Sequence, residues 1–283
     1  MMRPLLVRTR LDLDATLAAH RAVQSTVALV PTMGALHVGH AELIRRARDE
    51  AAVVVVSIFV NPTQFGLGED LDRYPRQLAA DVALCAAGGV DVVFAPDVHA
   101  IYPEGPGRGI SIDPGPDGRL LEGASRPTHF AGVLTVVTKL FALVRPQVAV
   151  FGEKDYQQLV LITRLARDLC LPIRVLGVPT VRAEDGLAVS SRNAYLDADG
   201  RTAATVLSRA LAAGQAQQRA GADAAGAAAR QVLQRETAVD IDYVAVTDRA
   251  LGPAPQTGEA RLLVAARVGA TRLIDNAALS LGG

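Results

Sequence analysis

The chain has 283 residues, 50% of them hydrophobic and 20% charged, a composition typical of a soluble globular protein with one large or two moderate domains. Its 29 acidic and 29 basic residues give a formal charge of zero, which disfavours extended nucleic-acid binding. Two widely separated cysteines, no visible secretory leader and no apolar stretch long enough to span a membrane predict a cytoplasmic protein.

The N-terminal part alternates apolar strand patterns with helical patterns, which predicts an α/β fold: a Rossmann-like parallel sheet with helices on both faces. Strands are expected at residues 27–30, 53–60, 91–96, 148–151 and 173–178. Helices are expected at residues 11–22, 41–50, 77–87 and 130–144, and a further helix opens in the segment 152–158 and reaches residue 169. Residues 101–128 are rich in Gly and Pro, so we expect an irregular excursion there, with a small strand near residues 110–112.

A segment with two histidines, Pro-Thr-Met-Gly-Ala-Leu-His-Val-Gly-His at residues 31–40, joins the first buried strand to a helix. Phosphates bind at such junctions because the first amides of a helix lack intrahelical partners. Gly34 and Gly39 allow close approach to the main chain, and the spacing of His37 and His40 places both imidazoles on one side of a helical turn. Two alternatives remain open: a metal site, which needs more ligands than these, or histidines that only cap the helix or pack in the core.

Two amide side chains, Asn61 and Gln64, lie just beyond the run of β-branched residues at 53–60. Ligands of parallel sheets collect at the carboxyl ends of the strands, so both side chains are expected at the same edge as the two histidines. The alternative is a loop that is stabilised by its own side-chain hydrogen bonds.

Lysine is rare in this chain. Of the 29 basic residues only Lys139 and Lys154 are lysines, which leaves 27 arginines. Lys154 follows a buried strand at a second junction between strand and helix, and a compact ammonium suits phosphate oxygens. We interpret Lys154 as a phosphate ligand, with an ion pair to Glu153 or Asp155 as the alternative.

The composition changes near residue 180. Ser190, Ser191 and Arg192 can fold over a polyphosphate, although this short pattern is common. Alanine-rich helices follow at residues 202–237, with Asp223 as the expected cap of the second helix. Strand patterns then lie at residues 241–246, 261–266 and 271–276. We predict two domains, residues 1–180 with the Rossmann-like sheet and residues 181–283 as a smaller α+β domain.

Several motifs occur in a recognisable order: Pro-Thr-Met-Gly-Ala-Leu-His-x-Gly-His, Asn-Pro-x-Gln-Phe, Tyr-Pro-Arg, His-Phe-x-Gly-Val, Phe-Gly-Glu-Lys-Asp-Tyr-Gln-Gln and Ser-Ser-Arg-Asn. By these motifs the chain resembles the pantothenate synthetase family over its whole length, within the wider His-x-Gly-His class of nucleotidyl-transferring enzymes. The resemblance implies ATP-dependent ligation of (R)-pantoate and β-alanine to pantothenate, a coenzyme A precursor, through a pantoyl adenylate with release of AMP and pyrophosphate. It also implies a cytoplasmic homodimer, Mg²⁺ bound with ATP, and no nucleic-acid or membrane partner.

The resemblance also implies roles for individual residues. ATP would contact Met33, Gly34, Ala35, Leu36, His37, Val38, Gly39, His40, Gly152, Glu153, Lys154, Asp155, Val181, Val189, Ser190, Ser191 and Arg192. Pantoate and β-alanine would contact Gln64, Gln158 and Asn61. The implied catalytic groups are His37, Lys154, Arg192 and, as proton donor, His40. The chain departs from the family at Val189, where methionine is usual, and at Thr128, where glycine is frequent.

Other functions remain as alternatives. A nucleotidyltransferase would adenylylate a phosphorylated small molecule and stop there, so its pyrophosphate exchange would require a phosphomonoester instead of pantoate. A nucleotide-binding sensor would bind ATP without forming pantothenate. A transfer-RNA charging enzyme is disfavoured because the chain is neutral and shows no additional RNA-binding domain.

Overall fold

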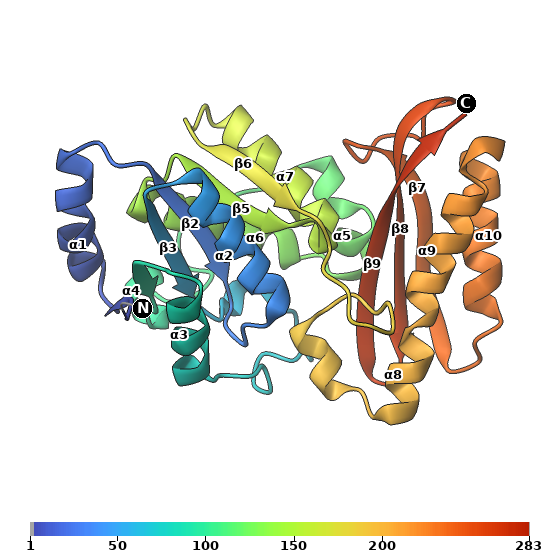
Figure 1. Ribbon diagram of the computed structural model, residues 1–283, viewed down its shortest axis with the longest axis horizontal. Helices are drawn as coiled ribbons and strands as arrows, with labels where there is room; N and C mark the ends of the chain where they lie inside the picture. Colours follow the sequence, from blue (N-terminus) through green and yellow to red (C-terminus); the bar gives the residue numbers. More distant parts are fainter. Residues whose placement is uncertain (1–2, 283) are drawn as a thin grey trace. The chain divides into compact units, whose positions relative to one another are not determined.

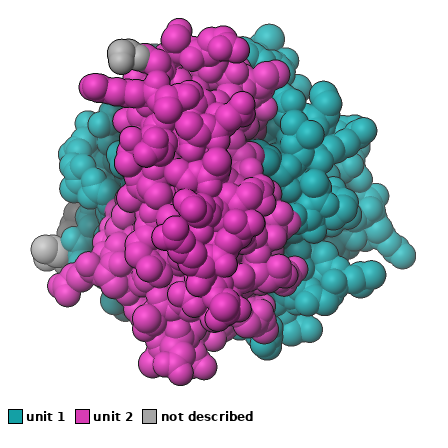
Figure 2. Space-filling view, turned by 90° about the vertical axis from the view of Figure 1, so that its right-hand side faces the viewer, with its two compact units in different colours: residues 1–153, 157–179 teal, residues 154–156, 180–283 magenta. Residues whose placement is uncertain are grey.

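The computed structural model describes residues 3–282 and divides into two compact units (Figures 1 and 2). The first unit comprises Met1–Glu153 and Gln157–Pro179, and the second comprises Lys154–Tyr156 and Thr180–Gly283. A segment of three residues therefore belongs to the second unit although it follows a strand of the first. Outside the described part lie the ends of the two predicted domains, residues 1, 2 and 283.

Six parallel strands form the sheet of the first unit, in the order β1-β4-β3-β2-β5-β6. They are β1 (Leu5–Val7), β2 (Val27–Thr32), β3 (Val53–Ile58), β4 (Val92–Phe94), β5 (Val148–Gly152) and β6 (Arg174–Val178). From β2 the chain builds towards β3 and β4 on one side, and later adds β5 and β6 on the other. The strand order therefore reverses beside β2, the position at which open α/β sheets bind ligands.

Helices cover both faces of this sheet, as predicted. They are α1 (Arg10–Ala22), α2 (Val38–Glu50), α3 (Leu78–Ala87), α4 (Val98–Ile101), α5 (Glu122–Ser125), α6 (His129–Val144) and α7 (Tyr156–Asp168). Alternate strand residues enter two cores, because successive side chains of a strand point to opposite faces. Val27 and Leu29 pack with α1, α6 and α7, whereas Ala28 and Val30 pack with α2 and α3. This double burial explains why the first four residues of β2 are all apolar.

The Gly- and Pro-rich excursion at residues 101–128 is irregular, as predicted. The prediction of a small strand at residues 110–112 is wrong, because these residues form no strand. The Ile112 amide donates to Thr135 Oγ1 of α6 at 2.9 Å, a side chain instead of a neighbouring strand. Within the described residues the regular structure of this excursion consists of the last residue of α4, Ile101, and two short helical turns, η2 (Pro116–Arg119) and α5.

The second unit contains an antiparallel sheet in the order β7-β8-β9, which confirms the smaller α+β domain. Its main elements are α8 (Ala198–Ala204), α9 (Val206–Ala216), α10 (Ala222–Gln234), β7 (Val239–Asp248), β8 (Gly258–Val268) and β9 (Thr271–Leu281). Leu207 and Leu211 of α9 share a core with Leu262 of β8. The predicted capping role of Asp223 is wrong, because α10 already begins at Ala222 and its N-cap position is Gly221, with a φ of 102°.

Candidate functional site

The two histidines of the first motif lie at the start of α2, directly after the loop that leaves β2. His37 is the N-cap residue, and its Nδ1 accepts a hydrogen bond from the Gly39 amide at 3.1 Å. His40 Nδ1 accepts from the His37 amide at 3.2 Å, which completes a reciprocal capping box. The ring centroids are 4.1 Å apart, so both imidazoles share one side of the turn, as predicted. Both histidines therefore cap the helix, as the alternative stated, and their phosphate role stays a prediction.

The capping bonds determine where each neutral imidazole carries its proton. A backbone N–H can only donate, so Nδ1 of His37 and Nδ1 of His40 must both accept. The proton of each neutral ring then lies on Nε2. Two Nε2–H donors beside the point where the strand order reverses suit the oxygens of a phosphate chain.

The loop between β2 and His37 is held from inside the protein by Asp81 of α3, which is 1% exposed. The Leu36 amide donates to Asp81 Oδ1 at 2.8 Å, and the Ala35 amide donates to Oδ2 at 3.1 Å. A Cβ on Gly34, whose φ is 87°, would lie 3.0 Å from Oδ2, so this position requires glycine. Burial raises the pKa of Asp81, and the two amide hydrogen bonds offset this only in part. These two amides, which belong to residues that the resemblance places against ATP, therefore already bind a carboxylate.

The loop after β3 holds both predicted amide side chains in buried positions. Asn61 Nδ2 donates to Gln64 Oε1 at 3.1 Å and to the Gly132 carbonyl at 3.2 Å, while the Tyr102 hydroxyl donates to Asn61 Oδ1 at 2.9 Å. Gln64 Nε2 contacts Met33 Sδ at 3.0 Å, which brings this loop against the first motif. The alternative of a self-stabilised loop thus describes Asn61, while Gln64 reaches the neighbouring loop.

The start of α6 supports the Gln64 backbone. His129 Nδ1 lies 2.9 Å from the Gln64 carbonyl oxygen, and Arg126 donates to the same oxygen at 3.2 Å. A Cβ on Gly132 would lie 2.3 Å from the Thr63 carbonyl oxygen, so only glycine allows this approach of helix and loop. These contacts account for His129 and Gly132 in the motif His-Phe-x-Gly-Val.

Gln157, to which sequence analysis assigned no role, organises the excursion at residues 101–128. Its Nε2 donates to the carbonyl oxygens of Asp117 and Leu120 at 2.8 and 2.9 Å, and its Oε1 accepts from the Glu122 amide at 3.0 Å. The paired glutamines of the motif Phe-Gly-Glu-Lys-Asp-Tyr-Gln-Gln therefore differ in use. Gln157 is buried and fully engaged with backbone groups, whereas the next residue, Gln158, is half-buried on α7.

Residues 181–189, which lead into Ser190, Ser191 and Arg192, form a hairpin in the second unit. Arg182 and Ala188 form an antiparallel bridge, and the Val189 amide donates to the Val181 carbonyl at 2.9 Å, so the two valines of the predicted ATP contacts face each other. Because that bond uses only backbone atoms, valine in place of the usual methionine preserves it. Ser190 caps the following turn, η4 (Ser191–Tyr195), by accepting from the Arg192 amide at 3.3 Å.

The predicted site residues thus form two groups, each described within its own unit. The first unit holds Met33, Gly34, Ala35, Leu36, His37, Val38, Gly39, His40, Asn61, Gln64, Gly152, Glu153 and Gln158. The second unit holds Lys154, Asp155, Val181, Val189, Ser190, Ser191 and Arg192. Among residues 3–282, no three His, Cys, Asp or Glu side chains are arranged to hold a metal ion.

Comparison with known proteins follows the same motifs over nearly the whole chain. A family model described as pantoate-beta-alanine ligase matches residues 5–278. The pantothenate synthetase of Nocardia farcinica is 58% identical over 270 residues, 95% of this chain and 84% of that protein. The pantothenate synthetase of Saccharopolyspora erythraea is 59% identical over 272 residues, 96% of this chain and 89% of that protein.

Solved structures give the same result. The crystal structure of pantothenate synthetase from Thermus thermophilus matches with a TM-score of 0.91 and 48% identity, over 96% of this chain and 98% of that one. The pantoate-beta-alanine ligase from Francisella tularensis, complexed with beta-gamma ATP and beta-alanine, matches with a TM-score of 0.81 and 34% identity, over 97% of each chain.

Proposed function

The chain belongs to the pantoate-β-alanine ligase family, and we propose that the residues of the two groups described above carry the two steps of this reaction. The enzyme uses ATP to join (R)-pantoate to β-alanine through a pantoyl adenylate, and it releases pyrophosphate and AMP. The capped histidine pair carries the proposal, because it fixes two N–H donors at the edge where the strand order of the sheet reverses.

In the first step a carboxylate oxygen of pantoate attacks the α-phosphorus of ATP in line with the bond to the β-phosphate. The P–O bond to the β-phosphate breaks and pyrophosphate leaves, so negative charge moves onto the β- and γ-phosphates. Fixed positive charges and N–H donors stabilise this change. In our proposal these groups are His37, His40, Lys154 and Arg192, with His40 as the proton donor. Gly152, Glu153, Asp155 and Val181 complete the nucleotide contacts.

In the second step the neutral amine of β-alanine attacks the carbonyl carbon of the adenylate, the C–O bond to AMP breaks, and the amine gives up one proton to solvent. Much of the gain comes from positioning, which is worth ~7 kcal/mol or more in well-oriented reactions. We assign this positioning to Gln64, Gln158 and Asn61. The buried contacts of Asn61 orient Gln64 before any substrate arrives, so less side-chain freedom is lost on binding.

Mg²⁺ is proposed as an ion that arrives with ATP. The side chains assigned to phosphate binding are two imidazoles, an ammonium and a guanidinium, which suit phosphate oxygens, whereas Mg²⁺ prefers oxygen ligands and retains several waters. Its ligands are therefore expected to be phosphate oxygens and water. The bound ion would neutralise part of the phosphate charge, in addition to the protein groups named above.

A homodimer in the cytoplasm completes the proposal. Within the described residues no helix has both the length and the apolar character needed to cross a membrane. Cys85 and Cys170 are both free thiols, which suits a reducing compartment. The dimer is proposed from the resemblance to the family, and light scattering coupled to size-exclusion chromatography would show it as a mass of twice the 29.6 kDa chain.

The test of the function is product identification with ATP, pantoate and β-alanine, together with pyrophosphate exchange into ATP. We expect pantothenate, and exchange that depends on pantoate. Exchange that required a phosphomonoester would instead support the alternative nucleotidyltransferase. Lys154→Ala should slow adenylate formation far more than it weakens pantoate binding, and an unchanged rate of adenylate formation would contradict the phosphate role of Lys154.

A further inference from the structure

Two adjacent polar residues, Asp275 and Asn276, lie buried in β9 among mainly apolar neighbours. Because consecutive strand residues point to opposite faces, they serve the two sides of the sheet of the second unit. Asp275 pairs in register with Val264, which belongs to the core beneath the helices, and Asn276 pairs with Leu263. Burying two polar side chains is costly unless both are hydrogen-bonded, so their partners show what they hold.

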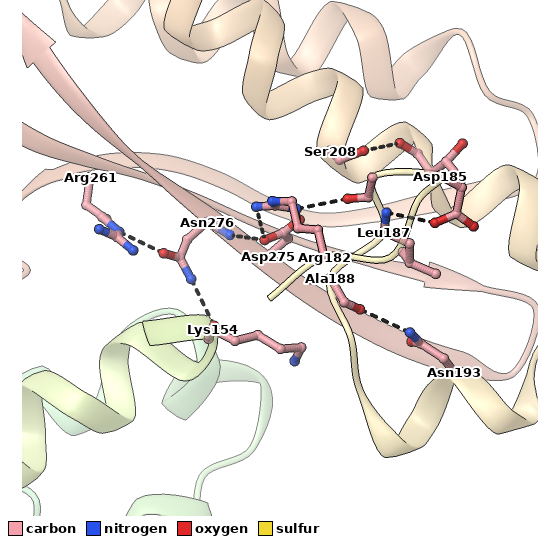
Figure 3. A network of polar contacts seen from close by, with 12 residues as sticks. Lys154, Arg182, Asp185, Leu187, Ala188, Asn193, Ser208, Arg261, Asp275 and Asn276 are labelled. Carbon is pink, nitrogen blue, oxygen red and sulfur yellow. Dashed lines mark hydrogen bonds and ion pairs between the residues drawn. The ribbon is translucent and has the colours of Figure 1, made fainter. Parts of the chain in front are cut away.

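Asn276 holds the segment Lys154–Tyr156. Its Nδ2 donates to the Lys154 carbonyl at 2.8 Å, and its Oδ1 accepts from Arg261 Nε at 2.7 Å (Figure 3). The Arg261 guanidinium also lies 4.1 Å from the centre of the Tyr156 ring, and the Tyr156 hydroxyl donates to the Arg249 carbonyl at 3.0 Å. In Figure 3 the Lys154 side chain extends away from Asn276, so the amide holds the backbone of Lys154 and not its ammonium group.

Asp275 holds the hairpin at residues 181–189. Its two carboxylate oxygens accept from both terminal nitrogens of Arg182, at 2.6 and 3.0 Å (Figure 3). Arg182 also donates to the Gly186 carbonyl at 3.1 Å and bridges to Ala188 across the hairpin. The backbone amide of Asn276 donates to Asp275 Oδ1 at 2.8 Å, which links the two sets of contacts.

We propose that Asp275 and Asn276 act as a positioning clamp for adenylate formation: they fix the backbone of Lys154 relative to the hairpin that leads into Ser190–Arg192. The inference rests on the proposed phosphate roles of Lys154 and Arg192. Lysine is a flexible point charge, so its ammonium reaches a defined place only if its backbone is fixed. Small displacements of catalytic groups cost large factors in rate, which gives the clamp a function beyond stability.

The first test is Asn276→Asp, which keeps an acceptor for Arg261 but replaces the donor to the Lys154 carbonyl with an oxygen. We expect the maximal rate of pantoate-dependent pyrophosphate exchange to fall about tenfold or more, with an unchanged KM for pantoate. The matched control is Gln215→Glu, because Gln215 Nε2 donates to the Ala278 carbonyl of the same strand at 3.1 Å. The control should exchange at the unmodified rate, and equal behaviour of the two variants would overturn the clamp.

A double-mutant cycle with Lys154→Ala separates positioning from stability. Asn276→Asp should add little in the Lys154→Ala background, because the group that it positions is already absent. Independent effects that multiply would show a purely structural role and overturn the clamp. If Lys154→Ala slows exchange but Asn276→Asp does not, the clamp alone is wrong. If Lys154→Ala leaves exchange unchanged, the proposed role of Lys154 fails and the clamp fails with it.

The second arm is Arg182→Lys, which keeps the positive charge but loses the two-point contact with Asp275. We expect a rise of about tenfold in the KM for ATP, at a melting temperature close to that of its control. The control is Arg272→Lys on β9, the strand that holds Asp275. There Arg272 Nε donates to Asp242 at 2.8 Å. This arm remains decisive if Asn276→Asp does not fold, and a KM equal to that of the control would overturn the clamp.

Discussion

At the scale of single residues, Asp81 stands where a phosphate would be expected. Two consecutive amides after residues of positive φ form a concave anion site, and here the anion is the protein's own carboxylate. The carboxylate therefore fixes the loop that presents His37 before ATP binds. Its raised pKa shows that burial outweighs these two hydrogen bonds in the balance of ionisation.

The variant Asp81→Asn tests this role. Asparagine accepts from one amide but turns an N–H towards the other, so we expect a loss of about 1–3 kcal/mol in the free energy of unfolding and a slower adenylation step. The control is Asp91→Asn, because Asp91 Oδ2 accepts from the Val54 amide at 2.7 Å at the start of β3, the end of the strand opposite to the binding loops. Urea unfolding and pyrophosphate exchange measure the two effects. If Asp81→Asn loses stability but exchanges pyrophosphate as fast as the control, the positioning role of Asp81 is wrong.

The residues that sequence analysis found and those it missed differ in the range of their contacts. His37 and His40 were found because their spacing is local, and Lys154 because lysine is rare in this chain. Asp81 and Asn276 were missed, since their partners lie 45 and 122 residues away. A polar residue within an apolar strand such as β9 was the only local sign of Asn276, and it does not identify a partner.

At the scale of elements, most strands and helices of the first unit lie close to their predicted ranges, because burial on both faces and helical periodicity are local patterns. The short elements β1, α4 and α5, of three or four residues each, were not predicted, since so few residues show no period. The predicted strand at residues 53–60, for example, is β3, Val53–Ile58. The wrongly predicted strand lies where a distant group replaced the expected partner. Thr135 supplies the hydrogen bond that a neighbouring strand was expected to give Ile112.

The loop after β3 yields a prediction about pH. Glu69 forms an ion pair of 2.6 Å with Arg126, which also donates to the Gln64 carbonyl. Burial would raise the pKa of Glu69, but the hydrogen bond and charge of Arg126, together with a backbone hydrogen bond from Gly66 and the nearby His129, lower the pKa below its ordinary value. A lowered carboxyl pKa stabilises the folded state above the unfolded pKa, and this contribution is lost as the pH falls through the folded pKa.

Glu69→Gln should therefore melt below the unmodified protein at neutral pH, and the difference should shrink as the pH falls from about 5 towards 3. Melting temperatures across this range measure the effect. Glu259→Gln is the control, because the Glu259 side chain, paired with Arg249, is 72% exposed and should contribute little. A constant difference between Glu69→Gln and the unmodified protein at every pH would contradict the prediction.

At the scale of the whole molecule, a division of the chain into continuous ranges does not describe the units. The predicted domain limit near residue 180 lies beside Pro179, where the first unit ends. The segment Lys154–Tyr156 nevertheless belongs to the second unit. The contacts that place it there come from Arg249, Arg261 and Asn276, about a hundred residues further along the chain. No local pattern indicates that these three residues belong to the second unit, because their contacts depend on the tertiary structure of the second sheet.

This division predicts how a fragment of residues 1–180 behaves. Both cores of the first unit are built from residues between 7 and 178, so the fragment should be soluble and should unfold cooperatively. It lacks every partner of Lys154–Tyr156 named above, together with Arg192, so pantoate-dependent pyrophosphate exchange should be undetectable. Circular dichroism during urea unfolding tests the first expectation, and exchange measured beside the full chain tests the second. An aggregated fragment would show that the first unit needs the second to fold, and a fragment active in exchange would show that adenylate formation does not use the second unit.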